Sequence, residues 1–83
     1  MKEFYKFYVN EALYVTISEA QDGNRLLQLK RDGDTAVLHE VILTPEQAIT
    51  VLRMLLIREA RLAKSGEDDI IKIIIAIIEF AKT

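Results

Sequence analysis

The stretch Val41-Ile42-Leu43-Thr44-Pro45-Glu46-Gln47 divides the chain into a half that favours strands and a half that favours helices. Its first three residues are apolar, and two of them are β-branched, which suits a strand. Thr44 is a suitable N-cap, Pro45 fits the first helical position, and Gln47 can complete a capping box. A helix is therefore expected to begin at Pro45, directly after a strand.

Four segments before Thr44 have the alternation or the composition of β-strands: 3–9, 13–20, 25–31 and 35–43. The breaks between them have the length of hairpin loops. Two of these breaks contain Asp-Gly, which is a strong signal for a turn. We therefore expect a four-stranded antiparallel β-meander, in which Leu13, Val15 and Ile17 share one face of the second strand.

The loop between the second and third strands bears on their register. A three-residue loop, with Gly23 or Asn24 in a left-handed conformation, is expected to place Ile17 opposite Leu29 and to bring the apolar rows onto one face. The fourth strand does not show which of its faces is buried, because its two rows are almost equally apolar.

Two helices are expected in the second half, over about 45–64 and 67–82. Ser65-Gly66 ends the first helix, and Ser65 with Asp68 can cap the second. The polar residues of the second helix fall on one narrow stripe at helical spacing: Asp68, Asp69, Lys72, Ala76, Glu79 and Thr83. The expected fold class is α+β, a single domain of residues 1–83 in the order ββββαα.

Oligomerisation is expected because a chain of 83 residues buries only roughly 60–65 % of its unfolded surface. The chain has no cysteine to form disulfides, yet 51% of its residues are hydrophobic. A helix that is apolar around most of its circumference is expected to lie between the subunits of a homodimer or tetramer. The predicted interface residues are Met54, Ile57, Ile70, Ile71, Ile74, Ile77 and Ile78.

Nothing in the sequence indicates an enzyme, a metal site or a cofactor. There is no cysteine nucleophile, neither serine lies in a nucleophile motif, and the single histidine, His39, lies in an apolar strand. The acidic run 67–69 is explained by the start of a helix. The chain has no signal-peptide pattern, and its one long apolar run is too short for a membrane span, so a cytoplasmic location is expected.

The face of the sheet opposite Leu13, Val15 and Ile17 carries aromatic and basic side chains. Aromatic rings beside cations suit single-stranded nucleic acid, since bases stack on the rings and phosphates meet the charges. Aromatic residues are also good strand formers, so a purely structural role remains open. The predicted nucleic-acid-binding residues are Phe4, Lys6, Tyr8, Tyr14, Arg25, Gln28, Lys30 and Arg31.

The order of elements, with 41–47 leading into a long helix, resembles the single-stranded-DNA-binding domain of the transcriptional positive-cofactor family and the archaeal ThermoDBP-type proteins. The specific match covers about Val41 to Leu52. Ala48 departs from it, because the cofactor family tends to have a bulky aromatic residue there. The isoleucine-rich second helix is closer to the assembly helices of the ThermoDBP type. The resemblance implies a homo-oligomer that binds single strands without strong sequence preference.

Two functions therefore remain open at the level of sequence. The first is binding of single-stranded DNA or RNA by the sheet face of a homo-oligomer. The second is a protein-interaction or assembly module that binds no nucleic acid. The formal net charge of −2 favours the second, because any attraction for phosphates has to come from a local patch.

Overall fold

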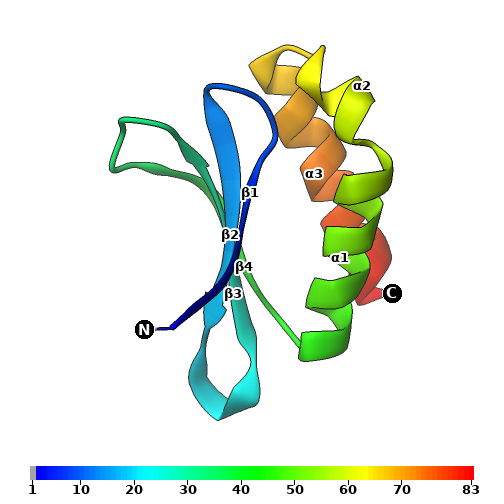
Figure 1. Ribbon diagram of the computed structural model, residues 1–83. Helices are drawn as coiled ribbons and strands as arrows, with labels where there is room; N and C mark the ends of the chain where they lie inside the picture. Colours follow the sequence, from blue (N-terminus) through cyan, green and yellow to red (C-terminus); the bar gives the residue numbers. More distant parts are fainter. Residues whose placement is uncertain (1) are drawn as a thin grey trace.

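A computed structural model describes residues 2–83 and shows a four-stranded antiparallel sheet with helices on one of its faces (Figure 1). Strands β1 (Glu3–Tyr8), β2 (Leu13–Glu19), β3 (Arg25–Arg31) and β4 (Val37–Leu43) lie side by side in chain order. The helices α1 (Pro45–Ile57), α2 (Glu59–Ala63) and α3 (Glu67–Lys82) follow. The predicted α+β class and the four-stranded meander are confirmed.

The β2–β3 hairpin brings the apolar rows together as predicted, but in a different register. Gln21–Gly23 form a short 3-10 turn in which Asp22 and Gly23 have φ values of 58° and 76°. The turn is closed by the Ala20 amide, which donates to the Asn24 carbonyl. Ile17 therefore lies opposite Leu27, not Leu29. A shift of two residues keeps every side chain on its face, because side chains alternate with period two.

His39, Val41 and Leu43 of strand β4 lie on the side of the helices. Val41 lies opposite Leu27, and the buried Leu43 lies opposite Arg25. Leu29 lies opposite His39, whereas Lys30 lies opposite Val37, so the register shifts by one residue here. Leu38 is left without a partner on β3, and its side chain packs against the core. The strand begins two residues later than expected, at Val37.

The predicted capping box at the start of α1 is confirmed. The Gln47 amide donates to Thr44 Oγ1 at 3.2 Å, and the Thr44 amide donates to Gln47 Oε1 at 3.0 Å. Both bonds satisfy amides that a helix start leaves without partners.

Two expectations about the later helix boundaries are wrong. The helix expected over 45–64 is interrupted at Arg58, whose φ of −99° and ψ of 11° separate α1 from α2. Ser65 does not cap α3, because its hydroxyl donates backward to the Arg61 carbonyl at 2.9 Å. Gly66 takes the N-cap position of α3 instead.

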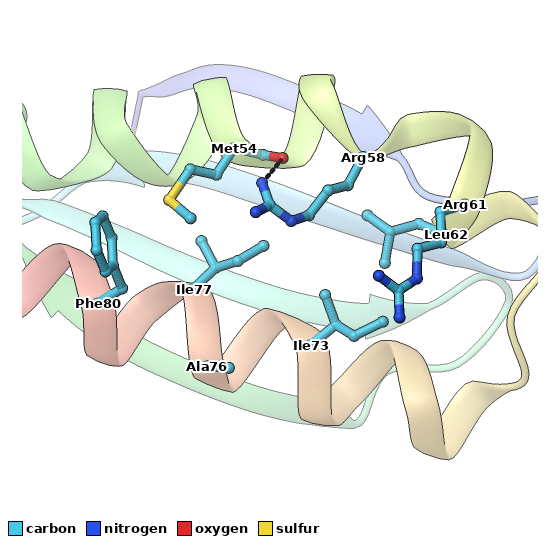
Figure 2. Close-up of a pocket in the computed structure, with 8 residues that line it drawn as sticks. All are labelled: Met54, Arg58, Arg61, Leu62, Ile73, Ala76, Ile77 and Phe80. Carbon is cyan, nitrogen blue, oxygen red and sulfur yellow. Dashed lines mark hydrogen bonds between the residues drawn. The ribbon is translucent and has the colours of Figure 1, made fainter.

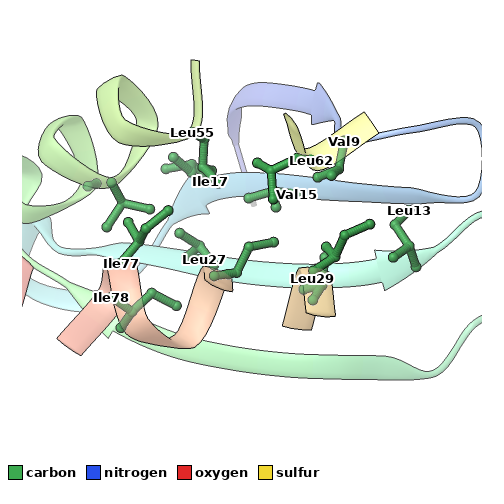
Figure 3. Close-up of a cluster of buried hydrophobic side chains, with 14 of the residues drawn as sticks. Val9, Leu13, Val15, Ile17, Leu27, Leu29, Leu55, Leu62, Ile77 and Ile78 are labelled. Atoms are coloured by element: carbon green, nitrogen blue, oxygen red, sulfur yellow. The ribbon is translucent and has the colours of Figure 1, made fainter. Parts of the chain in front are cut away.

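The core lies between the sheet and the helices, as Figure 3 shows. Helix α3 runs beside α1 on the same face of the sheet, so two surfaces cover its apolar side (Figure 1). Its predicted polar stripe is exposed throughout. The buried apolar residues are Val9, Leu13, Val15, Ile17, Leu27, Leu29, Leu43, Ala48, Val51, Leu55, Leu62, Ile70, Ile74, Ile77 and Ile78.

This packing corrects the predicted subunit interface. Ile70, Ile74, Ile77 and Ile78 are buried in the core of the single chain, so they offer no free surface to a second copy. The sequence expectation assumed that one sheet face could not cover so apolar a helix. The antiparallel neighbour α1 supplies the missing cover.

We expect Ile74→Ala to lower the free energy of unfolding by about 2–5 kcal/mol, because it leaves a cavity in a fully buried site. Ile49→Ala, at a half-exposed position of α1, is the control and should lose much less. Urea unfolding followed by circular dichroism measures both changes. Equal losses in the two variants would contradict this description of the core.

Candidate nucleic-acid interface

The helices cover one face of the sheet and leave the other, here called the open face, without a covering element (Figure 1). The register aligns its side chains in three rows across the four strands. Row one is Tyr8, Tyr14, Lys30 and Val37; row two is Lys6, Thr16, Gln28 and Glu40; row three is Glu3, Ser18, Leu26 and Ile42.

An aromatic pair and a shared cation form one end of the open face. The rings of Tyr8 and Tyr14 lie on neighbouring strands, with centroids 5.2 Å apart and planes tilted by 37°. The Lys6 ammonium lies 4.6 Å from the Tyr14 centroid and 5.2 Å from the Tyr8 centroid. The Tyr8 hydroxyl, as a neighbouring acceptor, raises the pKa of Lys6 above its usual value. The ammonium is therefore charged at neutral pH and attracted to two ring faces.

Lys30 adds a second cation to this cluster, because it lies directly opposite Tyr14 on β3. The cross-strand alternation that places the two tyrosines on one face also places Lys6 and Lys30 there. The resulting aromatic–basic cluster is defined by Lys6, Tyr8, Tyr14 and Lys30. It can offer π-faces and two positive charges to a ligand that lies across the strands.

Row two forms a packed polar centre. Thr16 is only 2% exposed although it belongs to the open face, since it lies between Lys6 and Gln28 in the register. Among the described residues its Oγ1 has no hydrogen-bond partner. Gln28 Nε2 donates to Glu40 Oε1 at 3.0 Å, which satisfies one oxygen of that carboxylate. A ligand therefore meets a flat surface here.

Phe4 does not lie on the open face, contrary to the sequence prediction. The register of β1 shifts between Glu3 and Tyr5, and this bulge turns Phe4 toward the side of the helices. With Tyr5 it lines a cleft of about 170 Å³ between β1 and the start of α1.

Arg25 and Arg31 also lie on the side of the helices, because odd-numbered residues of β3 face the core. The Arg25 guanidinium lies 4.3 Å from the Phe4 ring centroid and donates to the Gly23 carbonyl at 2.9 Å. Both contacts occupy Arg25 at the edge of the cleft, so Arg25, which was predicted to contact phosphates, lies on the other side of the sheet from the aromatic–basic cluster.

Arg31 joins the β3–β4 turn to the start of α3. Its Nη2 lies 2.7 Å from Glu67 Oε1, and its Nη1 lies 3.0 Å from Asp34 Oδ2. The bond to Glu67 raises the pKa of Arg31, whereas the Ala36 amide and then Arg31 lower the pKa of Asp34. Arg31 is thus paired with two carboxylates and is not available to the open face.

Five of the eight predicted binding residues therefore remain together on the open face: Lys6, Tyr8, Tyr14, Gln28 and Lys30. Two exposed apolar residues of this face, Val37 and Ile42, were missed by the sequence prediction. The two rows of β4 are almost equally apolar, so the sequence did not show which of its residues would lie on the open face.

No family model, curated protein or solved structure matches this chain. Within residues 2–83 no helix is both long and apolar enough to cross a membrane. The same residues contain no group of three or more His, Cys, Asp or Glu side chains placed to hold a metal ion. Function therefore has to be argued from the geometry of the chain itself.

We expect Thr16→Val to leave stability unchanged or to raise it, because valine keeps the shape and removes a buried hydroxyl that has no partner. An unsatisfied buried group destabilises by about 1–3 kcal/mol, which is the most that the change could add. Urea unfolding of the two proteins measures the difference. A clear loss of stability would contradict the prediction, since it would mean that the hydroxyl is hydrogen-bonded.

Proposed function

We propose that the open face binds single-stranded nucleic acid through its aromatic–basic cluster. The observation that carries the proposal is the Lys6 ammonium placed over the rings of both Tyr8 and Tyr14, with Lys30 opposite Tyr14. Bases stacked on tyrosine rings contribute about 1–3 kcal/mol each, and this term depends little on sequence. Lys6 and Lys30 would then contact the phosphates on either side of the stacked bases.

The distribution of charge supports the proposal despite the net charge of −2. Row one contains no carboxylate, and the acids of the open face, Glu3 and Glu40, lie in the other two rows. Glu40 is also hydrogen-bonded to Gln28. Charges farther away are screened beyond about 8–10 Å at physiological salt. The local field at the cluster is therefore set mainly by Lys6 and Lys30.

A protein-interaction module is the second candidate, and one observation favours it. Val37 and Ile42 are exposed on β4 of the open face, and Ile42 lies opposite Leu26. Exposed apolar side chains on an uncovered sheet suit contact with another protein surface. Ile42 lies in a different row from the aromatic–basic cluster, so its mutation can separate the two candidates.

The tyrosines provide the first test. Tyr8→Ala and Tyr14→Ala should each weaken binding of a labelled oligothymidine by roughly 5- to 100-fold, which corresponds to one lost stacking contact. Fluorescence anisotropy measures the affinity. Tyr5→Ala is the matched control, because Tyr5 is 54% exposed on the same strand but faces the side of the helices. Unchanged affinity in both open-face variants would contradict the proposal.

Salt dependence provides the second test. Lys30→Gln should lower the slope of log affinity against log salt by about 0.7–1, because one phosphate contact is lost. Lys72→Gln, which removes the same charge from the exposed stripe of α3, should leave the slope unchanged. No binding of the unmodified protein even at low salt would reject the proposal and favour the interaction module.

A further inference from the structure

A groove runs along the outer surface of the helix layer, between α1–α2 on one side and α3 on the other (Figure 2). Its volume is about 230 Å³, and its floor is apolar. Two arginines from the α1–α2 side stand among the lining residues. These residues are Met54, Arg58, Arg61, Leu62, Ile73, Ala76, Ile77 and Phe80.

The rim of this groove carries the two most exposed large apolar side chains of the described chain. Ile57 is 79% exposed and Phe80 is 63% exposed. Ile57 lies three residues after Met54 at the end of α1, so helical spacing puts it on the same flank of that helix. The groove and its rim thus form one apolar surface that faces away from the sheet.

The two helix segments that flank the groove have opposite net charge. The segment 45–64, which contains α1 and α2, has four basic and two acidic side chains, whereas α3 has four acidic and two basic ones. In a two-fold arrangement whose axis runs along the groove, α1 of one copy lies over α3 of the other, and unlike charges meet on both sides of the axis. A second copy of the chain therefore matches this surface in polarity and in charge.

The dimensions of the molecule also suit such an arrangement. The chain forms a plate of 35 × 28 × 16 Å, and the helix layer occupies one of its broad faces. A stable interface of standard size needs about 800 Å² from each partner, which is comparable with a broad face of this plate. Arg58 is already fixed at the groove, since its Nη1 donates to the Met54 carbonyl at 3.3 Å.

We infer that two copies of the chain dock through their helix layers, with Met54, Ile57 and Phe80 at the centre of the contact. Of the interface residues predicted from sequence, Met54 and Ile57 belong to this contact. The buried isoleucines of α3 do not, and the outer flank of α3 takes their place. The dimer has four layers, sheet–helix–helix–sheet. Both open faces then point outward on opposite sides, so each chain binds its own strand if the proposed function holds.

Sedimentation equilibrium at micromolar concentration tests this inference without nucleic acid. The unmodified protein should have twice the mass of the 9.5 kDa chain. Ile57→Asp and Phe80→Asp should each raise the dimer dissociation constant about 30-fold or more, because each buries a charge at the centre of the interface. Both side chains project out of the core, so the circular dichroism spectrum and urea midpoint of the separated chains should show a folded protein.

Leu56→Asp is the matched control, because Leu56 is 50% exposed on the flank of α1 that faces away from the groove. This variant should remain a dimer. A monomeric unmodified protein, or a dimer that Ile57→Asp and Phe80→Asp leave intact, would overturn the inference. Dissociation by Leu56→Asp alone would also overturn it and would assign the contact to the other flank of α1.

Oligonucleotide titration separates the two proposals. A short oligothymidine should saturate the dimer at one strand per chain, and Ile57→Asp should keep the affinity per chain. If the unmodified protein does not bind the oligonucleotide, the nucleic-acid function is rejected. The sedimentation result then still decides whether the chain dimerises. Saturation at one strand per dimer would contradict the outward arrangement of the open faces.

Discussion

The rest of the structure depends on the burial of two apolar pairs beneath α1 and α3: Val15 with Ile17 on β2, and Leu27 with Leu29 on β3. Because side chains alternate along a strand, burying these rows on one face fixes every neighbouring residue on the other. The sheet has helices on that one face only, so Tyr8, Tyr14 and Lys30 remain outside. The arrangement of the candidate site is thus a consequence of how the core forms.

The same packing explains why α3 is not a free surface. Four isoleucines of α3 are buried, because α1 and the sheet cover the apolar side of this helix within one chain. The outer surface of the helix layer is mixed. Ile57 and Phe80 are exposed there, beside charged residues whose sign differs between the two helix segments. The molecule therefore has two distinct outer faces, one with aromatic and basic side chains on the sheet and one with exposed apolar side chains among charged residues on the helices.

Local signals in the sequence were sufficient for the existence of the strands, the places of the turns and the start of α1, because the capping box 44–47 and the Asp-Gly pairs act over a few residues. They did not give the conformation of the turn at 21–24, and the predicted partner of Ile17 was therefore displaced by two residues. Features that depend on tertiary contacts were not predictable. The bulge that turns Phe4 inward and the ion pair of Arg31 with Glu67 involve partners remote in sequence. The face of β4 could not be assigned because both of its rows are apolar, and only pairing with Leu27 decides between them.

The central claim is that the open face, and not the helix layer, is the nucleic-acid surface. The most direct measurement is a ¹H–¹⁵N NMR titration of the protein with oligothymidine. Binding at the open face predicts that the amides of Lys6, Tyr8, Tyr14 and Lys30 shift progressively, while those of the α1–α3 groove stay in place. Shifts confined to the helix groove, or no shifts at all, would contradict it.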